Sequence, residues 1–286
     1  MPTEIIVRQM TEADFDAAME IKNAEGWNQT LRDWELIFSE SPEFCLVAVK
    51  DATVVGTVTA IVHEKKLAWI GMMLVRKPFR GMGIGQLLMK SILQKLEPCP
   101  SIKLDATPAG FPVYSKLGFE EEYLLNRMTR SPINQSYPDR QDFPIRPAVP
   151  EDLQAIADFD QEIFGVRRES VIGHMLASEP NVSIVLEDEN KIKGYLLGRP
   201  GTNYYQLGPL VSTVPESLHH LLTHALNRLK NQTVVVDVYQ DKENLIHWLQ
   251  AQGFAVQREF IRMYIGHNPY PGNVQLQYLI SGPELG

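Results

Sequence analysis

The fold is decided by the stretch Met73-Leu74-Val75-Arg76-Lys77-Pro78-Phe79-Arg80-Gly81-Met82-Gly83-Ile84-Gly85, which joins an apolar run to a helical run through a glycine-rich turn. Three glycines in five positions let the backbone approach a ligand and point several N–H groups the same way. The turn precedes a helix N-terminus, where free N–H groups and the helix dipole favour an anion. Arg80 adds a positive charge at the rim. A tight turn without a ligand does not need three glycines, so we predict a phosphate or pyrophosphate site.

Two other phosphate-binding patterns do not match this stretch. A P-loop requires the spacing GxxxxGK[ST], which the chain lacks. A Rossmann fingerprint requires GxGxxG after an early strand, followed by an acidic residue. Here the glycines fall as GxGxG after about the fourth expected strand, so neither site is predicted.

Outward from the loop, the residue pattern mixes strands and helices. Thr11 to Asp14 can cap a helix that begins near Phe15, and Gly118 is placed to end a short helix. The segment 67–75 is nearly all apolar, which is typical of a strand buried on both faces. The expected strands are 5–9, 44–49, 54–62, 67–75, 101–106 and 122–129, and the expected helices include 84–96 and 111–117.

The two halves of the chain echo each other. Arg8 and Arg146, Asp14 and Asp152, and Gly56 and Gly194 lie 138 residues apart, while Gly118 and Gly253, and Arg127 and Arg262, lie 135 apart. A constant offset at several identities is hard to obtain by chance, so we expect two similar domains in tandem. Prolines among Ser, Asn, Gln and Asp indicate a linker. The predicted organisation is a domain at 1–130, a linker at 131–144 and a second domain at 145–286.

Composition excludes several classes of protein. The 286 residues are 44% apolar and 22% charged, which is ordinary globular usage. A formal net charge of −8 argues against nucleic-acid binding by bulk charge, and no run reaches the roughly 18 apolar residues of a membrane span. The start, Met1 to Glu4, does not resemble a signal peptide. Because Cys45 and Cys99 form no CxxC, we expect no disulfide framework, no metal site and a cytoplasmic location.

The loop and a second motif together resemble the GCN5-related N-acetyltransferase (GNAT) superfamily. The second motif is Tyr114-Ser115-Lys116-Leu117-Gly118-Phe119, and the resemblance covers residues 1–130. A closer similarity is to bacterial tandem members with a degenerate second domain, carried by Glu25-Gly26-Trp27-Asn28, Ile70-Gly71, Leu104-Asp105, Gly208-Pro209-Leu210, Arg262-Met263-Tyr264 and Glu284-Leu285-Gly286. The resemblance implies an α/β (α+β) fold of two GNAT-like domains. Each would have a mixed, mostly antiparallel central sheet flanked by helices.

The resemblance also implies acetyl-CoA as the acyl donor. Its pantetheine arm would pair with the backbone of Met73, Leu74 and Val75, where the sheet of this family splays. Its pyrophosphate would be held beside Arg80 by the backbone N–H groups of Gly81, Met82, Gly83, Ile84, Gly85 and Gln86. Many members carry an asparagine seven residues before the motif tyrosine, but this chain has Thr107, which puts that contact in doubt.

Tyr114 stands where the family often places the general acid that protonates the departing thiolate. A phenol with a pKa of about 10 can donate a proton to a developing thiolate with a pKa of about 8.5. The alternative is a core tyrosine that only packs the short helix against the sheet. Glu25, with Trp27 beside it, lies in the region that shapes the acceptor site in this superfamily. Glu25 is the candidate base, although a solvated loop carboxylate is an equal alternative. Trp27 is the candidate pocket wall, although an ordinary packing aromatic is an equal alternative.

Two further titratable residues receive other interpretations. Asp105 matches Asp237 in the second half, where we expect no chemistry, so Asp105 is predicted to be structural. His63 follows an expected strand, where a lone histidine is usually exposed to solvent.

The second half keeps the repeated residues on either side of the loop but lacks the glycine-rich loop itself. Residues 212–217 replace the glycine-rich turn, and Leu249 stands opposite Tyr114. Gly71 and Asp105 lie 34 positions apart, whereas their counterparts Gly208 and Asp237 lie 29 positions apart. The second half is therefore shorter here by about the length of the glycine-rich loop. We therefore predict that the second half binds no CoA and either completes the acceptor pocket or replaces a dimer partner.

The predicted function is N-acetyl transfer from acetyl-CoA to the amine of a small molecule, with a monomer or homodimer as the working form. One alternative is a non-catalytic CoA-binding sensor or interaction protein. Another is an acyltransferase that uses a longer acyl-CoA or a protein amine. The fold alone does not identify the acceptor.

Overall fold

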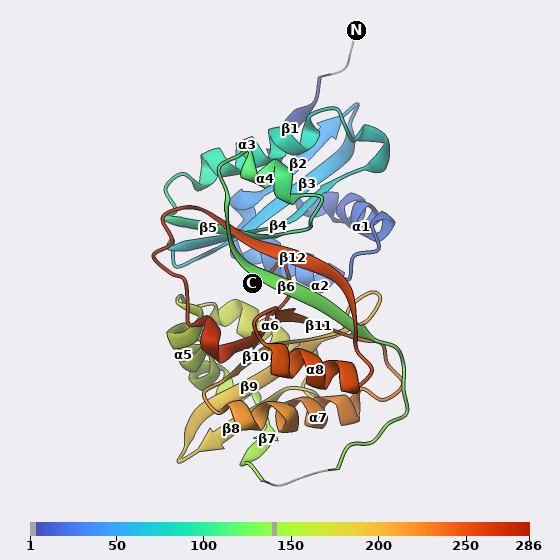
Figure 1. Ribbon diagram of the computed structural model, residues 1–286. Coiled ribbons are helices and arrows are strands. Elements are labelled where there is room, and N and C mark those ends of the chain that lie inside the picture. The colour runs from blue at the N-terminus through green and yellow to red at the C-terminus, as the bar shows by residue number, and fades with distance from the viewer. Residues whose placement is uncertain (1–3, 139–141) are drawn as a thin grey trace.

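The computed structural model describes residues 4–138 and 142–286 of the protein (Figure 1). Its strands are β1 (Ile6–Gln9), β2 (Cys45–Lys50), β3 (Thr53–His63), β4 (Leu67–Val75), β5 (Ser101–Ala106), β6 (Glu120–Arg130), β7 (Ile145–Pro147), β8 (Ile184–Asp188), β9 (Lys191–Arg199), β10 (Tyr205–Ser212), β11 (Val234–Tyr239), β12 (Ala255–Gly266) and β13 (Gln277–Leu279). They form one 13-stranded sheet in the order β1-β2-β3-β4-β5-β12-β6-β11-β13-β10-β9-β8-β7. Most neighbouring pairs are antiparallel, so the expected mixed, mostly antiparallel fold is confirmed.

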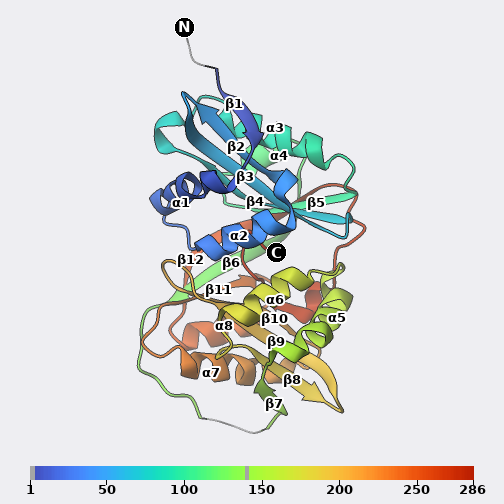
Figure 2. The same cartoon turned by 180° about the vertical axis from the view of Figure 1, so that it is seen from behind.

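The helices cover both faces of this sheet. They are α1 (Phe15–Ala24), α2 (Leu31–Glu40), α3 (Ile84–Leu96), α4 (Phe111–Ser115), α5 (Leu153–Phe164), α6 (Glu169–Ser178), α7 (Leu218–Arg228) and α8 (Glu243–Ala251). Short 3-10 turns occupy Glu12–Asp14, Pro42–Phe44, Lys77–Phe79, Pro150–Asp152, Pro215–Ser217 and Val274–Leu276. Figure 2 shows α1, α2, α5 and α6 on the near face, and Figure 1 shows α7 and α8 on the other.

Local sequence explains the first helices and strands. The Asp14 carboxylate accepts hydrogen bonds from the Thr11 backbone and hydroxyl, and Asp33 caps α2 in the same way through Thr30. Gly118, with φ +94°, follows α4 as predicted. The expected strand 67–75 and helix 84–96 are confirmed to the residue as β4 and α3.

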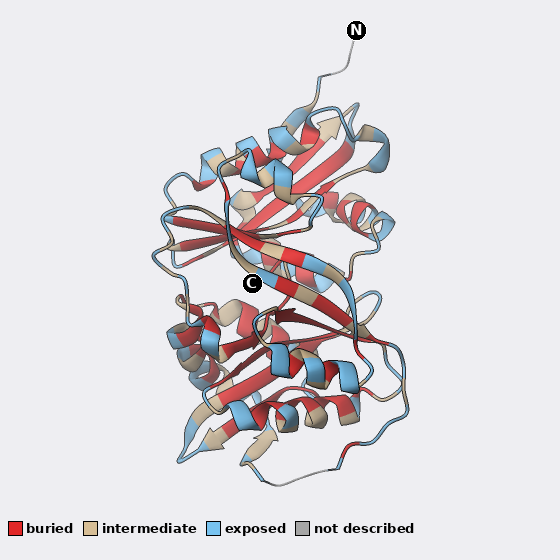
Figure 3. Ribbon diagram, viewed as in Figure 1, coloured by how far each residue is buried: buried red, intermediate tan, exposed pale blue. Residues whose placement is uncertain are grey.

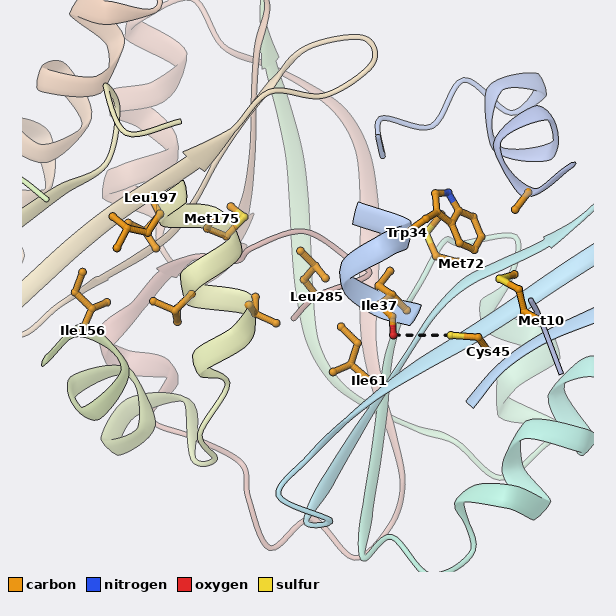
Figure 4. Close-up of a cluster of buried hydrophobic side chains, with 14 of the residues drawn as sticks. Met10, Trp34, Ile37, Cys45, Ile61, Met72, Ile156, Met175, Leu197 and Leu285 are labelled. Atoms are coloured by element: carbon orange, nitrogen blue, oxygen red, sulfur yellow. Dashed lines mark hydrogen bonds between the residues drawn. The ribbon is translucent and has the colours of Figure 1, made fainter. Parts of the chain in front are cut away.

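Strands β2 to β5, β10 and β11 are mostly buried, whereas β1 and parts of β6 and β12 are exposed, as are the outer faces of the helices (Figure 3). Along β2, Cys45 and Val47 pack on one face, whereas Leu46 and Ala48 pack on the other, following the two-residue period of a strand. The first of these clusters continues through α2 and α6 into the second half (Figure 4). Leu285 lies between these two helices, so one apolar core joins the halves.

The two halves exchange one long strand each, β6 and β12. β12, from the second half, lies between β5 and β6, and β6, from the first half, lies between β12 and β11. In Figure 1 the two long strands cross the middle of the molecule side by side. The two halves therefore share one sheet rather than having separate sheets. Residues 139–141 of the predicted linker lie outside the described residues.

β4 and β5 splay apart beside the glycine-rich loop. Their parallel pairing runs from Leu67 opposite Ser101 to Ile70 opposite Leu104 and then stops, although β4 continues to Val75. Met72, with φ +49°, lies at the register shift between β3 and β4. The C-terminal part of β4 thus has an edge that faces an open gap.

In the second half, the corresponding gap is filled. β10 and β11 pair in parallel only from Tyr205 to Leu207. β13 then enters between them and pairs antiparallel with both, through Leu279 opposite Leu210 and opposite Val238. The chain therefore supplies its own strand at the place where the first half leaves an opening.

Candidate active site

The glycine-rich loop presents free backbone N–H groups at the start of α3. Gly81 has φ +80° and Gly83 has φ +77°, values that residues with side chains rarely adopt. Within the described residues, the amides of 81–86 donate no hydrogen bond to another backbone group. A Cβ added at either glycine would meet nothing within 4 Å, so the space before the loop is open. These features fit a pyrophosphate bound by main-chain N–H groups at a helix N-terminus.

Cations at the rim of the loop hold the carboxylate of Glu25. Arg80 Nη2 lies 2.6 Å from Glu25 Oε1, and Lys77 Nζ lies 3.9 Å from the same oxygen. Arg80 Nε also donates to the carbonyl oxygen of Val75 at 3.1 Å. Arg80 remains 49% exposed, so an incoming phosphate can reach its guanidinium.

The edge of β4 fits an extended ligand. Leu74 and Val75 pair with β3 on one side, opposite Thr57 and Gly56. On the other side, the described chain supplies no strand beyond Ile70. An extended arm such as pantetheine can add to this edge by main-chain hydrogen bonds, so residues 73–75 fit the role that the resemblance implies.

A pocket of about 700 Å³, its mouth included, opens where β4 and β5 separate. It receives side chains from both halves of the chain, which the exchange of β6 and β12 brings together. The residues that line it are Trp27, Asn28, Gln29, Ile70, Gly71, Met72, Met73, Leu104, Asp105, Thr107, Tyr114, Arg127, Arg258, Phe260, Pro283 and Glu284. Its lining combines apolar and aromatic side chains with a few polar and charged groups, which is typical of a small-molecule site.

Tyr114 lines this pocket together with Met73. Burial raises the pKa of Tyr114 to about 12, so its hydroxyl stays protonated at neutral pH. The ring meets Phe119 edge to face, with centroids 6.0 Å apart. No hydrogen bond of the Tyr114 hydroxyl occurs within the described residues, so it can donate to a ligand. A protonated hydroxyl without a partner, in a pocket beside Met73, is compatible with the predicted general acid.

The structure separates the two residues that were expected to shape the acceptor site. Trp27 lines the pocket, but Glu25 does not, because its carboxylate is paired with Arg80 at the loop. The geometry therefore gives Glu25 no contact with the pocket, and its predicted role as the base finds no support there.

Several buried ion pairs cross between the halves, and two of them are repeat equivalents of each other. Arg262 Nε and Nη2 donate to the carboxylate of Asp105 at 2.9 and 3.0 Å. Arg127 donates to both oxygens of Asp237 at 2.7 Å. Asp105 has no exposed side-chain surface, and burial raises its pKa although Arg262 opposes the shift. As predicted, the Asp105 carboxylate has a structural partner, and that partner is the repeat equivalent of Arg127.

The last residues of the sequence form part of the pocket wall, which sequence reasoning missed. Trp69 Nε1 donates to the carbonyl oxygen of Pro283 at 3.0 Å. Glu284 is buried and forms an ion pair with Arg199, and burial raises the pKa of its carboxyl. A Cβ at Gly71 would lie 3.0 Å from the Glu284 Cα, so a larger residue there would push against the backbone of Glu284. The motifs that contain Gly71 and Glu284 were visible in the sequence, but their contact was not.

The second half differs from the first at the positions that correspond to the β4 edge and the glycine-rich loop. β13 occupies the gap between β10 and β11, where a pantetheine arm would otherwise pair. Glu216 lies in the turn that precedes α7, where a carboxylate would repel phosphate. Both features support the prediction that the second half binds no CoA.

Three further observations concern the described residues. No group of three or more His, Cys, Asp or Glu side chains among them is arranged to hold a metal ion. No helix in 4–138 or 142–286 has the length and apolar character required to cross a membrane. Cys45 and Cys99 are both free thiols.

Two sequence-family models match the chain, one in each half. The "Acetyltransferase (GNAT) family" model matches residues 7–119, and the "Acetyltransferase (GNAT) domain" model matches residues 156–279. The holothin acyltransferase of Pseudoalteromonas sp. (strain SANK 73390) is 27% identical over 265 residues, which are 92% of this chain and 88% of that protein. The uncharacterized N-acetyltransferase YitH of Bacillus subtilis is 21% identical over 66% of each chain.

Solved structures show the same fold. A crystal structure assigned as an acetyltransferase from Pyrococcus horikoshii superposes with a TM-score of 0.80 at 22% identity, over 99% of this chain and 96% of that one. A GCN5-related N-acetyltransferase from Sphaerobacter thermophilus superposes with a TM-score of 0.65 at 15% identity, over 91% and 95%. With both halves matched, and with the loop, the splayed strands and the pocket in place, this chain belongs to the GCN5-related N-acetyltransferase superfamily as a tandem acyltransferase.

Proposed function

We propose that the protein transfers the acetyl group of acetyl-CoA directly to the primary amine of a small-molecule acceptor. The observation that supports this most is the alignment of three features along the end of β4. They are the open loop at 81–86, the free strand edge at 73–75 and the pocket lined by Tyr114. A donor lying along the first two would bring its thioester to the third.

The chemistry needs two proton movements. Attack of the amine nitrogen on the thioester carbon forms a C–N bond and breaks the C–S bond, which leaves a thiolate. Tyr114 donates its hydroxyl proton to that sulfur, since its raised pKa of about 12 keeps it protonated beforehand. The nitrogen, which becomes positively charged on attack, releases one proton to solvent as the amide forms, and a proton from solvent restores the Tyr114 hydroxyl. A backbone N–H of the splayed strand would polarise the carbonyl oxygen during the attack.

The acceptor amine must lose a proton before it attacks, because a lysine-like ammonium has a pKa of about 10.4. The two carboxylates that line the pocket, Asp105 and Glu284, are already in ion pairs. We therefore propose that the amine enters unprotonated. The rate should then rise with pH through the pKa of the amine, and Glu25→Gln should leave this pH profile unchanged. A pH profile that flattens in the Glu25→Gln variant would instead restore Glu25 as the base.

Calorimetry with CoA and a panel of primary amines with acetyl-CoA together test the proposal. We expect one CoA per chain and acetylation of at least one amine. CoA binding without acetylation of any amine would favour the sensor function, and absence of CoA binding would contradict both functions.

The same assay should compare acyl donors. The name of the holothin acyltransferase specifies an acyl group and not an acetyl group, so the related reaction in this chain need not use acetyl-CoA. We propose acetyl as the preferred group, with activity declining from acetyl-CoA through propionyl-CoA to hexanoyl-CoA. A preference for hexanoyl-CoA would assign a longer acyl donor, and modification of protein lysines alone would assign a protein acceptor.

A further inference from the structure

One charged side chain in the pocket is not neutralised by a neighbour. Asp105 pairs with Arg262, Arg127 with Asp237, and Glu284 with Arg199. Arg258 also lines the pocket, but within the described residues it forms no ion pair and no hydrogen bond. Among the described residues, Arg258 is therefore the charged group of the pocket lining that has no paired partner, whereas Glu284 shares Arg199 with Asp33.

Arg258 is well placed to contact an acceptor. It lies on β12, directly opposite Arg127 of β6, so the strand exchange brings it into the first half's site. Its guanidinium carbon lies 5.9 Å from the centre of the Phe260 ring, which lines the same pocket. The side chain is half-buried, so an anion bound there would be partly shielded from solvent.

The pocket wall also holds acceptor atoms that lack donors. Gln29 Oε1 and Glu284 Oε2 are both buried, and neither has a hydrogen-bond partner. Buried polar atoms are nearly always paired, so we expect N–H groups of the ligand, or water that it orders, to satisfy them. The pocket thus has one unpaired cation and two unpaired acceptor oxygens.

We propose that the acceptor is an amine that also carries a carboxylate, and that Arg258 binds this carboxylate. The proposal rests on the proposed acyl transfer and specifies its acceptor. A guanidinium matches the planar carboxylate with two parallel N–H···O bonds, whereas an amide or an ester offers no negative charge. Because the whole chain carries a formal net charge of −8, the attraction between the protein and an anionic acceptor has to come from the local charge of Arg258.

The test uses the full chain, acetyl-CoA, and matched acceptors that differ only at the anionic group. These are free amino acids, their amides, and phosphate-bearing amines. We expect wild type to prefer the free acids. Arg258→Gln should raise KM for the acids roughly 10- to 100-fold, the loss expected for a hydrogen-bonded charge, and leave KM for the amides unchanged. Arg258→Lys should recover part of the loss.

Controls separate this idea from a general loss of function. Arg228→Gln, on the outer helix α7, should behave as wild type. The KM for acetyl-CoA should not change in Arg258→Gln, because Arg258 is not part of the loop or the β4 edge. Calorimetry of the acids with the CoA-bound protein gives a second readout that needs no turnover, and Arg258→Gln should lose that binding.

Three results would overturn the inference. They are equal use of acids and amides by wild type, a preference for phosphate-bearing amines, and no binding of any acid to the CoA-bound protein. Each of these leaves the proposed acyl transfer intact if neutral amines or phosphate-bearing amines are acetylated. Failure of CoA itself to bind would instead contradict the proposed function.

Discussion

At Tyr114, burial changes the acidity of the side chain that is proposed as the general acid. Its hydroxyl faces no partner within the described residues, and its raised pKa of about 12 makes it a donor rather than an acceptor. The sequence motif predicted its position, and the structure adds that it lines the pocket beside Met73 and Thr107.

We predict that Tyr114→Phe lowers kcat roughly 100-fold or more, the usual contribution of a positioned general acid. CoA affinity, measured by calorimetry, should remain within a factor of about 3, because the loop and the β4 edge are unchanged. A variant that loses CoA binding and kcat together would show that the ring only packs the site.

His63 corrects an expectation at the same scale. The sequence favoured an exposed histidine, but the ring is buried and meets Phe164 of the second half edge to face, with centroids 6.3 Å apart. Burial, with Arg168 nearby, lowers the pKa of His63 to about 4. The folded protein therefore keeps this ring neutral where the unfolded chain would protonate it.

This shift predicts a pH dependence of stability. The contribution of His63 is fully present above pH 6.5 and is lost as the pH falls towards about 4, by about 3 kcal/mol in total. Urea unfolding between pH 7 and 5 should show a shallower decline in His63→Gln than in wild type. His267→Gln, at an exposed position, should retain the wild-type slope, and equal slopes in all three proteins would contradict the prediction.

At the scale of elements, the loop before α3 depends on backbone conformation more than on side chains. Gly81 and Gly83 are in left-handed conformations with open space around them, so glycine is needed there for its φ angle. Gly85 differs, because a Cβ there would lie 3.1 Å from Met73 Cε.

We predict that Gly83→Ala weakens CoA binding roughly 10-fold, because an alanine in this conformation costs about 1 kcal/mol and the loop would relax away from it. The matched control is Gly173→Ala in α6, where the new Cβ would make ordinary contacts at 3.5 Å. That variant should bind CoA as wild type does. Calorimetry on both variants measures the difference, and equal affinities would argue against the loop as the binding site.

At the scale of the whole molecule, the exchange of β6 and β12 ties the halves together. Each exchanged strand carries an arginine that pairs with an aspartate of the other half. Arg262 of β12 pairs with Asp105, and Arg127 of β6 pairs with Asp237. Because both pairs are buried, losing one partner would leave an uncompensated charge in the shared sheet.

We predict that Arg262→Met lowers the free energy of unfolding by about 3 kcal/mol, and that adding Asp105→Leu recovers most of this loss. Arg8→Met breaks an ion pair whose arginine is 44% exposed and should cost about 1 kcal/mol or less. Urea unfolding of the four proteins gives the comparison. A double variant as unstable as Arg262→Met alone would show that the pair does more than neutralise charge.

The sequence by itself determined the local structure, including the glycine-rich loop that is the proposed donor site. The cap at Asp14, the extent of β4 and α3, and the glycine-rich loop depend on residues close together in the chain, so short-range rules predict them. The repeat also predicted two related halves.

Only the tertiary structure decided which half completes which site. The exchange of β6 and β12 and the approach of Arg258 and Glu284 to the pocket of Tyr114 join residues more than 100 positions apart. The entry of β13 between β10 and β11 joins Leu279 to Leu210 and Val238, which also lie far away in the sequence. Hydrophobic periodicity is the same for a strand that pairs with its own half and for one that pairs with the other half. The choice depends on which pairing buries the whole sheet, and that is a property of the folded chain.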